Sequence, residues 1–202
     1  MIDWTVESLK EFESRVAELF NSGAVRAPVH LSDGNEAALI DIFSSVKPQD
    51  WIFCSWRSHY QCLLKGVEPD KLISEIIAGR SIALCFPEFN LYSSAIVGGQ
   101  IPQSVGVALS IKIRKEDAHV WCFIGDMTSE TGMAQTAIRY AERHDLPITF
   151  VVEDNGISVL TETRKVWNSS TLRFEESKSD KVRSYKYKSS YPHAGAGVRV
   201  QF

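Results

Sequence analysis

The order of hydrophobic and polar positions predicts alternating helices and strands along most of the chain. Helices are expected where apolar residues recur at three- and four-residue spacing, and buried strands where short apolar runs are continuous. The expected helices are residues 6–21, 36–46, 70–78, 102–114 and 132–144. The expected strands are residues 51–55, 119–124 and 148–152, with further strands near residues 182–187 and 198–202. The segments 80–100 and 126–131 have the character of loops.

One stretch indicates the fold class. Strand 119–124, helix 132–144 and strand 148–152 form a strand–helix–strand unit, which is typical of a parallel sheet in an α/β fold. Such crossovers are right-handed, and ligands bind beyond the carboxyl ends of the strands. We expect residues 1–161 to form one α/β domain. Residues 162–202 are more polar, and we expect them to be an extension packed on the same domain.

Composition narrows the class of protein. The 202 residues suffice for one domain with a sizeable core, and 44% apolar with 23% charged residues is ordinary for a soluble protein. A net charge of −3 gives no reason to expect nucleic acid or a membrane surface as partner. The acidic N-terminus does not resemble a signal peptide. The four cysteines form no CxxC pair, so we expect reduced cysteines in a cytoplasmic protein.

Two oxygen-bearing side chains follow successive predicted strands. Asp126 follows the first and Asn155 follows the second. If these strands are neighbours, both side chains project into one crevice. Mg²⁺ prefers such ligands and is commonly held by few protein groups together with phosphate oxygens and water. An alternative stays open, because an Asp after a strand often caps the next helix and Asp154-Asn155-Gly156 is a good turn.

Several segments, in this order, resemble one known family. They are RVAEL at residues 15–19, HLSDGNEA at 30–37, WRSH at 56–59, AIVGGQIP at 95–102, GDMTSETG at 125–132 and EDN at 153–155. Together they resemble the alpha chain of the decarboxylating first component of 2-oxo acid dehydrogenase complexes, of the pyruvate, branched-chain and acetoin types. The resemblance covers residues 15–161. It implies the thiamine-diphosphate-binding fold, which has three layers, with helices on both faces of a mostly parallel sheet.

The resemblance implies a cofactor and a metal. Asp126, Asn155 and the backbone carbonyl of Ile157 are implied ligands of Mg²⁺. The implied contacts of thiamine diphosphate also include Trp56, Arg57, Ala95, Val97, Gly125, Met127 and Thr128. The forked guanidinium of Arg57 suits a diphosphate oxygen.

Histidines are the implied catalytic residues. By resemblance, His30 and His59 face the reacting end of the cofactor, where each can donate to a developing oxyanion or move a proton. His193 lies in a glycine-containing segment, and a second interpretation gives it the place of an active-site histidine of longer family members.

The sequence also departs from the family. Trp56 stands where the family has Tyr, and Met127 replaces the second glycine of GDG, where close backbone approach or a positive φ favours glycine. Residues 80–94 replace a longer glycine-rich loop. Family members continue for a hundred residues or more beyond residue 202. In the resembling enzymes a Glu from a beta-type chain activates the cofactor, and 202 residues leave no room for a second sheet domain. The resemblance therefore implies a beta-type partner that supplies the activating Glu, in an assembly of two alpha and two beta chains. The apolar face of helix 6–21 and residues 96–101 are candidate interfaces.

The expected function is therefore that of an oxidoreductase subunit. It would be the alpha subunit of a two-chain enzyme, dependent on thiamine diphosphate and Mg²⁺, that decarboxylates a small 2-oxo acid and transfers the acyl or enamine unit. A lipoyl-bearing acyltransferase is a candidate acceptor. Two alternatives stay open: a stand-alone carboligase or decarboxylase subunit of a specialised biosynthetic pathway, and a degenerate, non-catalytic scaffold subunit.

Overall fold

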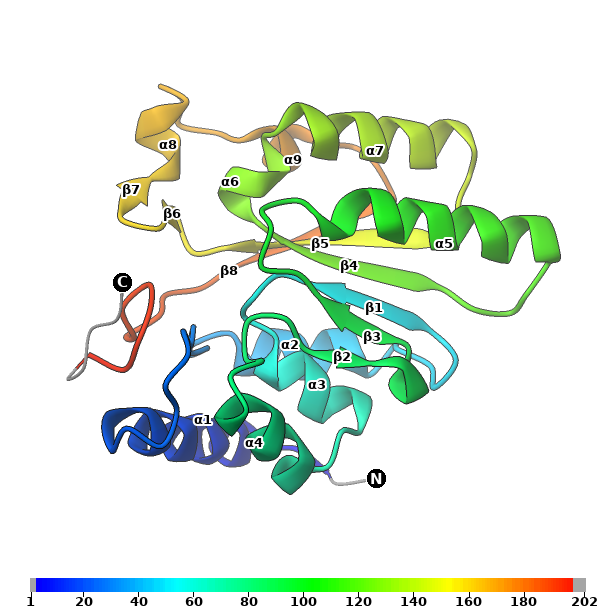
Figure 1. Ribbon diagram of the computed structural model, residues 1–202. Helices are drawn as coiled ribbons and strands as arrows, with labels where there is room; N and C mark the ends of the chain where they lie inside the picture. The colour runs from blue at the N-terminus through cyan, green and yellow to red at the C-terminus, as the bar shows by residue number, and fades with distance from the viewer. Residues whose placement is uncertain (1–2, 198–202) are drawn as a thin grey trace.

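The computed structural model describes residues 3–197, which form three layers around a central sheet (Figure 1). The sheet has the strand order β2-β3-β1-β4-β5-β8. Its strands are β1 (Trp51–Cys54), β2 (Cys85–Phe86), β3 (Leu91–Ser93), β4 (Val120–Gly125), β5 (Ile148–Asp154) and β8 (Val182–Lys186). Neighbouring strands are parallel except for the antiparallel pair β2–β3. The predicted α/β fold with a mostly parallel sheet is confirmed.

Helices cover both faces of this sheet (Figure 1). One face carries α1 (Val6–Asn21), α2 (Glu36–Phe43), α3 (His59–Lys65) and α4 (Pro69–Ile77), and the other carries α5 (Gln100–Arg114) and α7 (Gly132–Arg143). Successive strand residues point to opposite faces. Thus Phe123 of β4 belongs to the core beneath α1–α4, whereas Cys122 and Ile124 belong to the core beneath α5 and α7.

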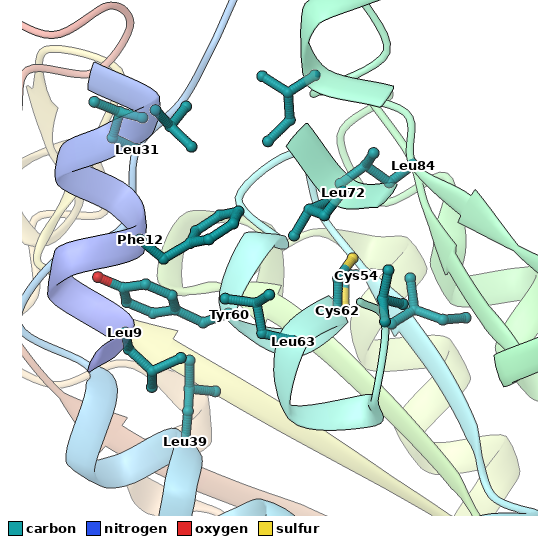
Figure 2. Packing of buried hydrophobic residues seen from close by; sticks show 14 of the residues in the cluster. Leu9, Phe12, Leu31, Leu39, Cys54, Tyr60, Cys62, Leu63, Leu72 and Leu84 are labelled. Carbon is teal, nitrogen blue, oxygen red and sulfur yellow. The ribbon is translucent and has the colours of Figure 1, made fainter. Parts of the chain in front are cut away.

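The apolar face of α1 is part of the core. Leu9, Val16 and Phe20 have no exposed surface, and Phe12 is also buried. Figure 2 shows Leu9 and Phe12 on the side of α1 that faces Tyr60 of α3. The predicted helix 6–21 is therefore confirmed, but the prediction that its apolar face binds a partner is wrong, because this chain's own helices already cover that face.

The segment between α4 and α5 is more ordered than predicted. Instead of a loop it contains β2, a short 3-10 helix (Pro87–Phe89) and β3, which pairs in parallel with β1. Short helices elsewhere were also missed, among them α3, and α6 (Asp126–Ser129) directly after β4. These elements are too short for a clear periodicity, and β3 exists through its long-range hydrogen bonds to β1.

The polar segment after β5 returns to the sheet. It forms the hairpin β6 (Ile157–Ser158) and β7 (Thr161–Glu162), then α8 (Thr163–Val166) and α9 (Arg173–Glu176), and ends in β8. The predicted edge strand at residues 182–187 is confirmed, since β8 pairs with β5 at the sheet edge. Arg164 of α8 is ion-paired with Asp154 at 2.8 Å and with Glu175 at 2.9 Å. The strand expected at residues 198–202 lies outside the described residues.

The cysteines are free, as predicted. Cys54, Cys62 and Cys122 are buried, and Cys85 is exposed. Over residues 3–197, no helix combines the length and the apolar character needed to cross a membrane.

Candidate functional site

A cleft lies at the carboxyl ends of β1, β4 and β5. Its walls come from the segments that follow these strands and from the chain beyond β8. The lining residues are Ser55, Trp56, Arg57, Val97, Gly125, Asp126, Met127, Thr128, Glu153, Asn155, Ile157, Ser158, Val159, Tyr187 and His193. The cleft is narrow, with a volume of about 70 Å³, and it opens to solvent. A polar groove between α7 and residues 173–181 is larger, but it contains none of the predicted site residues.

The structure brings Asp126 and Asn155 together. β4 and β5 are neighbours with Gly125 opposite Glu153, so both predicted ligands follow adjacent strand ends and line the same cleft. Asp126 is 2% exposed, and its buried Oδ2 has no hydrogen-bond partner within the described part of the chain. Burial raises the pKa of this carboxyl group, and the neighbouring Thr163 hydroxyl opposes that shift. A buried, unpartnered carboxylate oxygen is costly unless a ligand engages it.

The donor set around Asp126 suits a hard cation. Asn155 Oδ1 accepts a hydrogen bond from the backbone N–H of Ile157 at 3.1 Å, which fixes the turn that presents the Ile157 backbone. Residues 3–197 contain no cluster of three or more His, Cys, Asp or Glu side chains suited to a metal. A cation at Asp126 and Asn155 would therefore need ligand oxygens from elsewhere, as Mg²⁺ bound to a diphosphate has.

Met127 fits the position where the family has glycine. It lies inside α6 with a helical backbone, so the chain does not require a positive φ there. Gly125, two residues earlier, has nothing within 4 Å of the place where a Cβ would lie. The local backbone therefore accepts Met127 without strain and leaves open space beside Gly125.

Two nitrogen donors face the cleft from the segment after β1. Arg57 donates from Nε to the carbonyl of Leu31 at 3.2 Å and from Nη2 to the carbonyl of His193 at 2.8 Å. Its charge has no carboxylate ion pair among residues 3–197, and Nη1 remains available to a ligand. The buried indole Nε1 of Trp56 likewise has no partner in this range. Both groups suit an anionic ligand.

Only one of the two predicted cofactor contacts in the segment after β3 lines the cleft. Val97 lines the cleft and is 55% exposed. Ala95 is exposed and is not a lining residue. Thr128, by contrast, lines the cleft from α6 as predicted.

His30 and His193 form one aromatic cluster with Trp56. The ring centroids of His30 and His193 are 4.8 Å apart, and those of His30 and Trp56 are 5.7 Å apart. His193 and Trp56 line the cleft, whereas His30 lies behind them with its buried Nδ1 unpartnered within the described chain. Burial, together with the charge of Arg57, lowers the pKa of His30 to about 3 and also lowers the pKa of His193. Both rings are therefore neutral near pH 7.

His59 does not reach the cleft. Its side chain has no exposed surface. Its Nδ1 lies 2.9 Å from Glu13 Oε2, and its Nε2 lies 2.9 Å from Ser81 Oγ. Both ring nitrogens are thus engaged inside the protein, on the α1 side of the sheet.

Sequence reasoning missed the acid on the cleft floor. Glu153 of β5 is buried, accepts a hydrogen bond from Gln61 at 3.2 Å and accepts another from the hydroxyl of Tyr185. Burial raises the pKa of Glu153 to about 7, although the Tyr185 hydroxyl and the charge of Arg57 oppose that shift. The only sequence signal was its place beside Asp154-Asn155.

The wall formed by residues 188–195 was also missed. Ser190 N–H donates to Asp33 Oδ2 at 3.0 Å, and Gly195 N–H donates to the carbonyl of Val29 at 3.0 Å. The carbonyl oxygen of Lys188 lies only 2.2 Å from the position that a Cβ of residue 34 would take, so only glycine fits there. These contacts hold the segment against the loop before α2. Its polar sequence gave no sign of this role.

Comparison with known proteins finds relatives over most of this chain. Residues 5–180 match the family described as the dehydrogenase E1 component. The alpha subunit of acetoin:2,6-dichlorophenolindophenol oxidoreductase from Bacillus subtilis is 30% identical, over 78% of this chain and 51% of that protein. The pyruvate dehydrogenase E1 component subunit alpha from Zymomonas mobilis is 26% identical, over 78% of this chain and 48% of that protein.

The matched relatives are longer than this chain. The chain spans about half the length of the curated relatives it matches. A solved structure of a candidate thiamin diphosphate-dependent enzyme from Mycobacterium smegmatis aligns with a TM-score of 0.43 and 20% identity, over 67% of this chain and 23% of that one. The family match covers most of the chain. The protein therefore belongs to the dehydrogenase E1 component family.

Proposed function

We propose that this chain is an alpha-type subunit that binds thiamine diphosphate through Mg²⁺ and, with a beta-type subunit, decarboxylates a small 2-oxo acid and transfers the resulting acyl unit. The observation that carries the proposal is the unpartnered, buried Oδ2 of Asp126 beside Asn155, at the ends of adjacent parallel strands. Membership of the dehydrogenase E1 component family supports the same conclusion.

The residues present fit the cofactor. Asp126, Asn155 and the carbonyl of Ile157 would supply oxygen ligands to Mg²⁺. Arg57 and the indole N–H of Trp56 would donate to the diphosphate, because both are polar, line the cleft and have donors to spare. The remaining proposed contacts are Ala95, Val97, Gly125, Met127 and Thr128, which follow β3 or surround the start of α6.

Thiamine diphosphate, when bound, supplies a carbon nucleophile for the 2-oxo carbon of a substrate. The protein's own groups position this reaction and manage its protons. His193 lies at the cleft and His30 lies behind it, and both are neutral near pH 7, so each ring can offer one N–H as a hydrogen-bond donor and one nitrogen as an acceptor. His59 acts through other residues in this proposal, because its ring nitrogens are already engaged.

An exposed apolar rim supports the partner subunit. Ile96 and Leu160 are 73% and 84% exposed, and Val97, Ile157 and Val159 are also exposed and line the cleft. Apolar residues gathered at the rim of a site are typical of protein interfaces. We propose that the beta-type subunit covers this rim and supplies the activating Glu. An assembly of two alpha and two beta chains and a lipoyl-bearing acceptor belong to the same proposal.

Calorimetric titration of thiamine diphosphate into the complex purified with its partner, with Mg²⁺ or with chelator, tests the proposal. Asp126→Ala and Asn155→Ala should each abolish Mg²⁺-dependent binding, because each removes a metal ligand. Asp117→Ala is the matched control, since Asp117 is an exposed carboxylate paired with Lys47. Unchanged affinity in Asp126→Ala would refute the metal site.

The same titration, together with an assay of 2-oxo acid conversion and acyl transfer to a lipoyl domain, separates the alternative functions. If the wild-type complex binds no cofactor, the chain is a non-catalytic scaffold. If it binds cofactor and converts a 2-oxo acid without transferring an acyl group to a lipoyl domain, it is a carboligase or decarboxylase subunit. Acyl-lipoyl product supports the proposed dehydrogenase role.

A further inference from the structure

A chain of buried hydrogen bonds lies behind the cleft. The backbone N–H of Ser32 donates to Glu13 Oε1 at 2.6 Å, Glu13 Oε2 lies 2.9 Å from His59 Nδ1, and His59 Nε2 lies 2.9 Å from Ser81 Oγ. Glu13, His59 and Ser81 are each at most 1% exposed. A polar group buried this deeply is costly unless it is fully hydrogen-bonded, so the set acts as a unit.

The order Glu–His–Ser matches that of a hydrolase triad, but its burial excludes that function. A nucleophilic serine must reach a substrate carbonyl. Ser81 has no exposed surface, and neither it nor His59 lines the cleft. The function of this unit must therefore be exerted through the segments that it connects.

Those segments carry the anion-binding side of the cleft. Glu13 belongs to α1, Ser32 follows His30 and Leu31, and His59 begins α3 two residues after Arg57. Arg57 in turn donates to the carbonyl of Leu31. The loop that holds His30 and the turn that holds Arg57 are thus joined twice: directly through the Leu31 carbonyl, and behind it through Glu13.

We propose that Glu13 and His59 are positioning residues that set the placement of Arg57 and His30 for an anionic cofactor, without touching that cofactor. The hydrogen bond between Glu13 and His59 carries this role because Glu13 also binds the backbone of Ser32, in the loop that holds His30. The hydrogen bond between His59 and Ser81 connects only to the segment before β2. The identity of the ligand rests on the proposed function. A site displaced slightly from its productive geometry loses affinity even when every contacting residue is present.

Two substitutions of His59 test its hydrogen bonds to Glu13 and to Ser81 separately. In His59→Asn, the amide nitrogen lies near the place of Nδ1, so the bond to Glu13 survives and the bond to Ser81 is lost. In His59→Gln, the longer side chain reaches the place of Nε2, so the bond to Ser81 survives and the bond to Glu13 is lost.

Two readouts on the full chain with its partner are needed. Amide hydrogen exchange of residues 30–35 reports loop order without any ligand. Calorimetry with thiamine diphosphate and Mg²⁺ reports affinity. His59→Gln should raise exchange at Ser32 about tenfold and weaken cofactor binding about tenfold, as expected for loss of one buried, charge-assisted hydrogen bond. His59→Asn should stay within about threefold of wild type in both readouts, because it keeps the bond to Glu13.

The outcomes distinguish this inference from the proposed function. Equal behaviour of His59→Asn and His59→Gln overturns the inference, as does faster loop exchange in His59→Gln with unchanged cofactor affinity. If wild type binds no cofactor, the proposed function and the cofactor role of Glu13 and His59 fail together. If wild type binds and Ser32 exchange does not respond to His59→Gln, only the positioning role fails.

Discussion

The guanidinium of Arg57 donates a hydrogen bond to the backbone carbonyl of His193 at 2.8 Å, across 136 positions of the sequence. The same group donates to the carbonyl of Leu31. One side chain therefore joins the turn after β1, the loop before α2 and the segment after β8. Its charge is directed to the place where these three segments meet.

Arg57→Lys should weaken cofactor binding by at least about tenfold, because a lysine keeps the charge but cannot donate to two carbonyls in a fork. It should also expose residues 188–195 to limited proteolysis. Calorimetry and a protease time course measure the two effects. Arg139→Lys, on the exposed side of α7, is the control. Wild-type behaviour of Arg57→Lys in both assays would contradict the role given to the fork.

Gly34→Ala should destabilise the protein by about 2 kcal/mol or more. Gly34 has a φ of +81°, and a Cβ there would meet the carbonyl oxygen of Lys188. Urea unfolding measures the change. Gly106→Ala in α5 is the matched control: its Cβ would meet nothing within 4 Å, so it should stabilise the helix by about 0.5–1 kcal/mol. Similar effects of the two substitutions would show that the Lys188 contact is not tight.

His30 should make the stability depend on pH. Its pKa falls from 6.5 to about 3 on folding, chiefly through burial. Between these values the unfolded state binds a proton that the folded state does not, so stability decreases as pH falls below 6.5 and is unaffected above it. Wild type should lose roughly 1 kcal/mol more than His30→Gln between pH 7.5 and 5.5, after allowance for the partial exposure of His30. Urea unfolding at both pH values measures this difference, and parallel losses in the two proteins would contradict the prediction.

Phe20→Ala in α1 should destabilise the chain by about 3–5 kcal/mol, since Phe20 has no exposed surface and its removal leaves a cavity. Ile96→Ser at the cleft rim should change stability by no more than about 0.5 kcal/mol but weaken association with the partner. Thermal unfolding and a pull-down with the partner provide the measurements. If the Phe20→Ala chain were stable but failed to bind its partner, the apolar face of α1 would be part of the interface after all.

The sequence predicted the parts of the fold that are long or local. β4, α7 and β5 were recognisable because two continuous apolar runs flank an amphipathic helix, and the positions of Asp126 and Asn155 follow from those strands. β3 was not recognisable, because three residues carry no periodicity and the strand depends on its pairing with β1.

Side-chain direction was the other limit. The segment 56–59 places Arg57 at the cleft but turns His59 inward to Glu13, and no spacing rule distinguishes these two outcomes. The wall at residues 188–195 depends on backbone contacts with the loop before α2, which polar sequence does not reveal.

The position of that wall has a consequence for biosynthesis. The proposed metal ligands emerge from the ribosome with β5 and the turn after it, but His193, which accepts the hydrogen bond of Arg57, emerges about 40 residues later. The cleft therefore cannot be complete before residue 193 has emerged, and binding of the proposed cofactor would follow that step.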